Sequence, residues 1–197
     1  TVEAVAKLEL MDTAPAPSTA PDRTATVPGG GSILTPSAQL PAGKQLGHFK
    51  IDRPLGSGGM GEVYLAQDLA LDRPVAVKVL PEGVSRDPRR RDRMIREARA
   101  QARVAHPNVG HIYFVGEDDG LRYFAMEYVA GDTLAERISK GPMPVEDALA
   151  VIRAATLGLR EAERSGITHR DVKPSNLMID GHGVVKVLDF GLAAGGL

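Results

Sequence analysis

The sequence predicts an α+β fold in which an antiparallel sheet carrying one helix is followed by a more helical region. Between residues 48 and 129, short runs rich in β-branched and aromatic residues are separated by turn signals. One helical segment interrupts these runs, and it begins at Asp87 as the N-cap with Pro88 at the first helical position. A longer helical pattern follows Pro144, where apolar residues recur every three to four positions.

Length, composition and charge limit the classes of protein to consider. The 197 residues, 43% of them hydrophobic, suit one globular domain plus some disordered chain. A formal net charge of -1 gives no bulk attraction to nucleic acid or to an anionic membrane, so no nucleic-acid partner is expected. No run approaches the ~18 apolar residues that span a bilayer. The absence of Cys excludes disulfides, a thiolate zinc site and a Cys nucleophile.

The N-terminal segment has the composition of a linker. Residues 12–45 contain six of the 14 prolines, together with many Ala, Ser and Thr residues, the run Gly29 to Gly31 and few charges. Such a segment cannot bury enough apolar surface to offset the entropy lost on ordering. Residues 1–45 are therefore predicted to be a disordered Pro/Ala/Gly-rich linker.

The elements that follow are predicted from turns and breakers. Five strands are expected in a first sheet, at residues 48–55, 62–68, 73–80, 111–116 and 121–129. The helix that begins at Pro88 should run to about Ala105, and Gly131 should end the sheet. A short helix near 134–138, a long helix from Pro144 to a stop at Gly166, and a hairpin of 177–180 with 184–190 should follow.

A glycine-rich segment, Leu55 to Val63, fits the pattern G-x-G-x-x-G-x-V. Glycines let backbone amides approach a polyphosphate without an intervening side chain. A dinucleotide-binding fold would need a helix to begin inside the motif, but the sequence continues as a strand. The Walker pattern is also excluded, because no Gly-Lys-Ser/Thr follows. An isolated match of this kind is more typical of an ordinary hairpin turn, so other signals must support it.

Lys78 is a single lysine in an otherwise apolar strand, Val75-Ala76-Val77-Lys78. Such a lysine usually extends to water unless it has a partner. Glu97, in the following helix, is the candidate partner, and the ion pair would hold the ammonium against the α- and β-phosphates of a nucleotide. The many arginines of that helix are expected to form a solvated face with i,i+4 pairs such as Arg93 with Glu97.

The most informative stretch is His169-Arg170-Asp171-Val172-Lys173-Pro174-Ser175-Asn176. Phosphoryl transfer to a hydroxyl needs a carboxylate to accept the proton, a cation near the transferred group and oxygen ligands for Mg²⁺. Asp171 can serve as the base, Lys173 as the cation and Asn176 as a metal ligand. Asp189, in Asp189-Phe190-Gly191, follows an apolar strand and can be the second metal ligand.

In this order and spacing, the motifs resemble the protein kinase family, specifically the eukaryotic-like Ser/Thr kinases of bacteria. The resemblance implies a two-lobed fold, with a five-stranded small lobe at residues 46–129 and the beginning of a helical large lobe at 130–197. It implies ATP and Mg²⁺ as cofactors and a cytoplasmic location. Lys173, two residues after Asp171, resembles the Ser/Thr branch, so the implied substrates are Ser or Thr hydroxyls of proteins.

The same resemblance assigns roles to individual positions. Asp171, Lys173, Lys78 and Glu97 would be catalytic, and Asn176 and Asp189 would bind metal. The nucleotide site would be formed by Leu55, Gly56, Ser57, Gly58, Gly59, Met60, Gly61, Val63, Ala76, Lys78, Met126, Glu127, Val129 and Leu177. Met126 would be the gatekeeper, and Glu127 to Val129 the hinge that meets the adenine edge. Arg170 is expected to be a buried cation that binds a phosphorylated activation loop.

Two alternatives differ in the chemistry they allow. A non-catalytic nucleotide-binding pseudokinase would usually have lost the strand lysine, the base or the metal-binding Asp, and here Lys78, Asp171 and Asp189 are all present. A small-molecule phosphotransferase of related fold would usually lack the Lys-Pro pair after the base, which is present at Lys173-Pro174.

The resemblance covers residues 46–197. The remainder of the activation segment and the later large-lobe helices of the family do not follow Gly191 in this sequence. The helix 144–165 is therefore expected to expose an apolar face, and the 197-residue piece alone is expected to be unstable and catalytically inactive. In related kinases a transmembrane segment often follows the kinase domain, so a membrane anchor beyond Leu197 is an expectation for a longer protein.

Overall fold

The structure is a computed structural model that describes residues 39–58, 61–81 and 88–190. Most of the predicted linker lies outside the described residues, as do Gly59 and Met60 of the glycine-rich segment and the predicted N-cap Asp87. The chain divides into two units, Thr1–Pro36 and Ser37–Leu197. The fold described below is that of the second unit.

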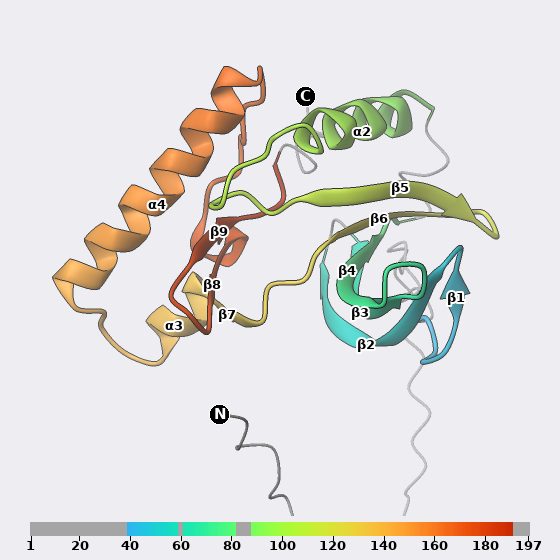
Figure 1. Cartoon of the computed structure of the whole chain (residues 1–197), viewed down its shortest axis with the longest axis horizontal. Helices are drawn as coiled ribbons and strands as arrows, with labels where there is room; N and C mark the ends of the chain where they lie inside the picture. The colour runs from blue at the N-terminus through green and yellow to red at the C-terminus, as the bar shows by residue number, and fades with distance from the viewer. Residues whose placement is uncertain (1–38, 59–60, 82–87, 191–197) are drawn as a thin grey trace, which may run out of the picture. The chain divides into compact units, whose positions relative to one another are not determined.

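The first half of this unit is built around one antiparallel sheet of six strands (Figure 1). Its strand order is β1-β2-β3-β4-β6-β5. The strands are β1 (Gln45–Leu46), β2 (Phe49–Gly58), β3 (Gly61–Asp68), β4 (Arg73–Val79), β5 (Ile112–Asp118) and β6 (Leu121–Glu127). The five strands expected from the sequence are present, and the β5–β6 hairpin turns at Asp119 and Gly120, whose φ angles of 51° and 75° suit a tight turn.

The additional strand, β1, corrects the expected count of five. Residues 39–45, which composition assigns to the linker, are ordered along the sheet instead. Gly43 N donates to Ile51 O at 2.8 Å, and Ile51 N donates to Lys44 O at 2.9 Å. Leu46 is fully buried, and Leu40 packs against the same apolar cluster. Two anchoring leucines and backbone pairing thus order a segment whose average composition is that of a linker.

The sheet presents a different chemistry on each face. Residues of one face form an apolar cluster, which contains Leu46, Phe49, Ile51, Tyr64, Ala66, Val75, Val77, Val79, Tyr123 and Ala125. Ala76 and Lys78 alternate with these valines and therefore lie on the opposite face. Val63 is opposite Lys78 on β3, and Met126 is opposite Ala76 on β6. Directly paired residues of antiparallel strands share a face, so these four side chains lie together.

Helix α2 (Pro88–Gln101) begins at Pro88 as expected and ends four residues before the predicted Ala105. Its Ala98 is fully buried in a cluster with Leu80, Ile112 and Phe124. Because Phe124 is paired with Lys78 across β4 and β6, the helix packs at the face of the sheet that carries Lys78. This arrangement brings the helix that contains Glu97 toward the strand lysine.

The second half contains helices and a three-stranded sheet of order β7-β8-β9. The elements are β7 (Gly131–Thr133), α3 (Leu134–Ser139), α4 (Val145–Arg164), the 3-10 turn η1 (Pro174–Asn176), β8 (Leu177–Asp180) and β9 (Val185–Val187). The helices and the β8–β9 hairpin were expected. The first sheet ends before Gly131, as expected, and Gly131 then begins β7 of the second sheet, a strand that the sequence did not predict. A Cβ at Gly131 would lie 2.1 Å from Ile179 O, so glycine permits this close strand pairing.

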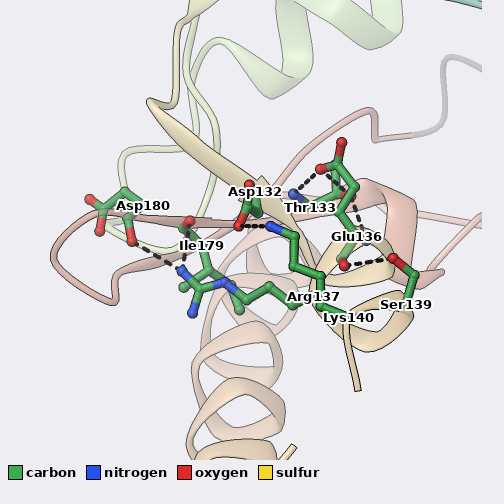
Figure 2. Close-up of polar contacts among 8 residues, drawn as sticks. All are labelled: Asp132, Thr133, Glu136, Arg137, Ser139, Lys140, Ile179 and Asp180. Atoms are coloured by element: carbon green, nitrogen blue, oxygen red, sulfur yellow. Dashed lines mark hydrogen bonds and ion pairs between the residues drawn. The ribbon is translucent and has the colours of Figure 1, made fainter. Parts of the chain in front are cut away.

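Polar contacts attach α3 to the three-stranded sheet (Figure 2). Thr133 and Glu136 form a reciprocal capping box at the helix N-terminus. Lys140 Nζ lies 2.8 Å from Asp132 Oδ2, and both side chains are substantially exposed. Arg137 reaches the carbonyl oxygens of Ile179 and Asp180 at the end of β8. These contacts lie within the second half of the unit.

Helix α4 packs one face against β9 and the segment that follows it. Ala155 and Ala162 are buried in a cluster with Leu177, Val187 and Phe190. Another face of the same helix exposes Val145, Leu149 and Ile152, as the sequence predicts. Gly166, with a φ of 76°, follows the helix as the expected stop. Within the described residues, no helix is long and apolar enough to cross a membrane.

The close approach of α4 to the 106–110 segment gives a stability prediction. Replacing glycine by alanine inside a helix normally stabilises it by about 1 kcal/mol. At Gly158, however, the added Cβ would lie 2.6 Å from Asn108 O, a backbone atom. We therefore expect Gly158→Ala to lower the free energy of unfolding by about 1–3 kcal/mol, in the range of overpacked cores. Urea denaturation of the full-length protein measures this change.

Thr156→Ala is the matched control, because Thr156 is exposed on the same helix. Alanine has the higher helix propensity, so this variant should unfold at an equal or slightly higher urea concentration than the parent. An equal gain in stability for both variants would show that α4 is not pressed against Asn108.

Candidate active site

Three segments far apart in the sequence meet at one place in the structure. They are the end of β4 with Lys78, the loop 169–176, and residues 188–190 after β9. Lys78 Nζ lies 2.9 Å from Asp189 Oδ1, and the lysine is only 2% exposed. A buried ammonium needs such a partner, because desolvation strongly disfavours an unpaired charge. The strand lysine and the predicted metal ligand are therefore in direct contact.

The loop 169–176 is attached to the same segment by backbone and imidazole contacts. His169 is buried, and its Nδ1 accepts a hydrogen bond from Asp171 N at 3.2 Å. Its Nε2 lies 2.9 Å from Leu188 O, and a protonated Nε2 donates in this pair. Leu188 N donates to Asn176 O at 2.9 Å. His169 thus links the loop that carries the predicted base to the residue before Asp189.

Asn176, a predicted metal ligand, is in direct contact with Asp171, the predicted base. Its Nδ2 donates to the backbone oxygen of Asp171 at 2.8 Å and to Asp171 Oδ2 at 3.2 Å. The amide nitrogen is thereby directed at Asp171, which leaves Oδ1 as the atom able to bind a cation. A chain of contacts therefore runs from Lys78 through Asp189, Leu188 and Asn176 to Asp171.

Two residues of the site adopt the left-handed backbone conformation, Arg170 with φ of 64° and Asp189 with φ of 58°. This conformation is uncommon outside glycine, although aspartate tolerates it better than most residues. Local strain of this kind persists only where surrounding contacts hold it. For Asp189, the ion pair with Lys78 and the burial of the adjacent Phe190 supply such contacts.

Asp171 is paired with Lys173, the predicted catalytic cation. Lys173 Nζ lies 2.7 Å from Asp171 Oδ2. The hydrogen bond from Lys173 lowers the pKa of the Asp171 carboxyl below its usual range, and the bond from Asn176 acts in the same direction. Asp171 is therefore a carboxylate at neutral pH, the form in which it can accept a proton.

The ion pair expected between Lys78 and Glu97 is not formed. Lys78 contacts Asp189 instead. Glu97 Oε1 lies 3.2 Å from Arg93 Nε, one turn earlier on α2, and 3.3 Å from Arg170 Nη1. The Glu97 carboxylate is therefore paired with two guanidinium groups, and the Lys78 ammonium is paired with Asp189. Arg170 is also not the buried cation expected from the sequence, because its side chain is 48% exposed.

The predicted nucleotide-binding residues are partly assembled. Val63, Ala76, Lys78 and Met126 share one face of the six-stranded sheet. Gly56 and Ser57 lie near the end of β2, opposite Val63 and Glu62, and Leu55 is 38% exposed. Val129 is buried after β6, whereas Leu177 belongs to the apolar cluster that also contains Val187 of β9. Gly59 and Met60 lie outside the described residues, and Gly58 pairs with Gly61 in the hairpin.

Sequence reasoning missed Lys186, which contacts the predicted hinge. Lys186 Nζ lies 2.6 Å from Glu127 Oε1, and both side chains are mostly buried. The signal that drew attention to Lys78, a single lysine in an apolar strand, is also present in Val184-Val185-Lys186-Val187-Leu188. His169 was recognised only as part of a motif, and its bridging contacts become visible only in three dimensions.

The family of this chain follows from a comparison of its sequence with family models. The model of the protein kinase domain matches residues 49–195. The chain belongs to the protein kinase family. The match includes all the segments that meet at Lys78, Asp171 and Asp189, so the site lies within the kinase domain. The expected fold class is confirmed, with six rather than five strands in the small-lobe sheet.

Named kinases support the bacterial branch of the family. The chain is 42% identical to the serine/threonine-protein kinase PrkC of Bacillus subtilis over 153 residues, 77% of this chain and 24% of PrkC. It is 45% identical to the serine/threonine-protein kinase PknB of Mycobacterium tuberculosis over 150 residues, 74% of this chain and 24% of PknB. The chain thus spans about a quarter of the length of these relatives.

Solved structures give the same assignment. The kinase domain of PknI from Mycobacterium tuberculosis, crystallised as a C20A mutant, matches with a TM-score of 0.73 and 32% sequence identity. The similarity covers 80% of this chain and 64% of the PknI chain. Both the strand arrangement and the sequence therefore agree with a bacterial kinase domain of the eukaryotic-like type.

The Asp171–Lys173 contact leads to a prediction about protonation. Replacing Lys173 by methionine removes the hydrogen bond that contributes most to lowering the pKa of Asp171. We expect the pKa of Asp171 to rise toward that of an ordinary aspartate, because a nearby cation favours the ionised carboxylate. As the pH is lowered, any process that needs ionised Asp171 should then decline at a higher pH than in the parent protein. Carboxyl-carbon NMR titration measures the pKa directly.

A second Asp–Lys pair provides the matched control. Lys140 lowers the pKa of Asp132 in the same way, mainly through a side-chain hydrogen bond. Lys140→Met should raise the pKa of Asp132 and leave that of Asp171 unchanged. An unchanged pKa for Asp171 in Lys173→Met would contradict the assigned pairing.

Proposed function

We propose that this chain forms the nucleotide-handling part of an ATP-dependent protein serine/threonine kinase, which transfers the γ-phosphoryl group of Mg-ATP to protein hydroxyls. The observation that carries the proposal is the contact chain from Lys78 through Asp189 and Asn176 to Asp171. It joins a cation, two oxygen donors and a carboxylate base, the groups that phosphoryl transfer requires.

The donor set fits magnesium bound together with a nucleotide. Mg²⁺ usually takes one or two protein carboxylates and completes its octahedron with phosphate oxygens and water. Lys78 contacts Oδ1 of Asp189, which leaves the second carboxylate oxygen for a metal, and Asn176 offers Oδ1. The described residues contain no cluster of three His, Cys, Asp or Glu that could hold a metal by itself. Asp189 and Asn176 would hold Mg²⁺ together with phosphate oxygens of ATP and water.

Each protein group then has a distinct task. Lys78 binds and orients the phosphates, and Gly56 with its neighbours brings backbone amides close to them. Asp171, whose ionised form is favoured by its contacts with Lys173 and Asn176, orients the substrate hydroxyl and accepts its proton. Lys173 stabilises the charge that develops on the transferred group. Bound Mg²⁺ supplies neutralisation of the phosphate charge.

The proposed substrates are Ser and Thr residues of proteins, as in the names of the relatives PrkC and PknB. Lys173 at two positions after Asp171 supports this choice over tyrosine. A cytoplasmic location for the catalytic region is part of the same proposal, because ATP and the substrates must reach it.

The test is a transfer assay on the full-length protein with γ-labelled ATP, Mg²⁺ and a mixed peptide library. Label on Ser and Thr, dependent on Mg²⁺, is the expected result. Nucleotide binding without any transfer would support the pseudokinase alternative. Label found only on a small molecule or on Tyr would overturn the proposed substrate class.

A further inference from the structure

The hinge carries an ion pair that none of the catalytic roles above uses. Glu127 is the last residue of β6, at the edge that is expected to meet adenine. Its carboxylate lies 2.6 Å from Lys186 Nζ, and the two side chains are 24% and 16% exposed. Lys186 is the central residue of β9, the strand that leads directly to Leu188 and Asp189. The pair therefore connects the six-stranded sheet to the three-stranded sheet.

The alternation of side chains along β9 directs Lys186 toward this contact. Its neighbours Val185 and Val187 are buried at 3% and 0% exposure, each in an apolar cluster. Successive strand residues point to opposite faces, so Lys186 lies on the face away from these valines. Its ammonium is mostly shielded from water and has a carboxylate at hydrogen-bonding distance. A lysine that merely extended to solvent would show neither feature.

Glu127 holds a third segment at the same point. Its Oε2 accepts a hydrogen bond from His111 N at 3.3 Å, and its backbone N donates to His111 O at 2.8 Å. The residues before His111 are bonded to β9, since Val187 N donates to Asn108 O and Gly110 N donates to Val187 O, both at 2.9 Å. Glu127, the 108–111 segment and β9 thus each contact the other two.

We propose that Lys186 is a positioning residue for nucleotide binding, which acts through Glu127 to fix the hinge edge on which the adenine base rests. This inference depends on the proposed nucleotide-binding function. The backbone from Glu127 to Val129 can present its hydrogen-bonding groups to a base only when the end of β6 is held in place. Lys186 holds this end of β6 and lies on β9, the strand that also positions Asp189. The position of the base and the position of the phosphates therefore both depend on β9.

The experiment compares binding of the base with catalysis in the full-length protein. In Lys186→Met, we expect the affinity for adenosine to fall roughly fivefold, a modest coupling between sites. The KM for ATP should rise by a similar factor, whereas kcat should change by less than about twofold, because Lys186 supports ground-state and transition-state binding alike. Calorimetry with adenosine and steady-state kinetics give these values.

Further variants separate positioning from general stability. Lys186→Arg should retain most of the adenosine affinity, because a guanidinium can still bind the Glu127 carboxylate. The double variant Lys186→Glu with Glu127→Lys should bind adenosine more tightly than either single variant. Lys140→Met removes a Lys–Asp contact of 2.8 Å elsewhere and should leave adenosine affinity unchanged.

The possible failures are distinguishable. If the parent protein binds neither adenosine nor ATP, both the proposed function and this inference are wrong. If the parent binds adenosine but Lys186→Met binds it equally well, only the inference is wrong. The inference is equally overturned if Lys186→Met changes kcat and the affinity for inorganic tripolyphosphate as much as the affinity for adenosine, since that result indicates a structural role alone.

Discussion

Replacing Asp171 by asparagine is expected to lower kcat for phosphotransfer by about 10²–10⁴-fold, the usual contribution of a general base. The expected loss follows from the position of this carboxylate, which is oriented by its contacts with Lys173 and Asn176. Asparagine keeps the side-chain shape but cannot accept the proton. The KM for ATP should change little, because the proposed task of Asp171 is to orient the acceptor hydroxyl and accept its proton, not to bind the nucleotide. Steady-state kinetics with a Ser peptide measures both quantities.

Asp132→Asn is the matched control for this substitution. Asp132 is an exposed aspartate whose pKa is also lowered by a lysine, at 2.8 Å, but it lies on β7 beside α3 (Figure 2). The control should retain the parental kcat. Comparable losses in the two variants would mean that Asp171 has no special role in proton transfer.

Replacing Lys78 by methionine is expected to lower kcat/KM by about 10²–10³-fold, as found when one preorganised electrostatic group is removed from an active site. Methionine fills similar apolar volume but supplies no charge to the phosphates. It also leaves Asp189 without its 2.9 Å partner. Both effects act on the phosphate end of the nucleotide, so the affinity for adenosine alone should be nearly unchanged.

Lys50→Met serves as the control for Lys78→Met, because Lys50 is exposed on β2. It should keep the parental kcat/KM. If Lys78→Met transfers phosphate at the parental rate, the assignment of the strand lysine to the phosphates is incorrect. Loss of adenosine binding in Lys78→Met would indicate instead that the sheet had been disrupted.

Local signals in the sequence predicted most of the fold. Turns with glycine or proline, such as Asp119-Gly120 and the helix start at Pro88, have defined backbone preferences and appear where expected. The strand β1 was not predicted, because burial of Leu46 and pairing with β2 are tertiary effects in a segment of linker-like composition. The end of the first sheet before Gly131 was predicted, but strand β7 was not, because its pairing depends on the close approach of Gly131 to Ile179.

The candidate site was predicted by residue type better than by pairing. Lys78, Asp171, Asn176 and Asp189 could be named because phosphoryl transfer needs a cation, a carboxylate base and metal-binding oxygens, and because their motifs, in this order, resemble those of protein kinases. The partner of Lys78 could not be predicted, because several cations can pair with Glu97. The sequence does not show which of them lies close to it. Arg93 and Arg170 take that carboxylate, and Asp189 takes the ammonium. Lys186 carried the same sequence signal as Lys78, but its partner lies 59 residues away in the chain.

The most direct test of the central claim is a crystal structure of the full-length protein with Mg²⁺ and a non-hydrolysable ATP analogue. We expect the metal to be bound by oxygens of Asp189 and Asn176, the Lys78 ammonium to contact the phosphates, and the Asp171 carboxylate to face the terminal phosphoryl group. An analogue bound at another surface, or bound here with its phosphates directed away from Lys78 and Asp189, would contradict the proposal that these groups serve one nucleotide.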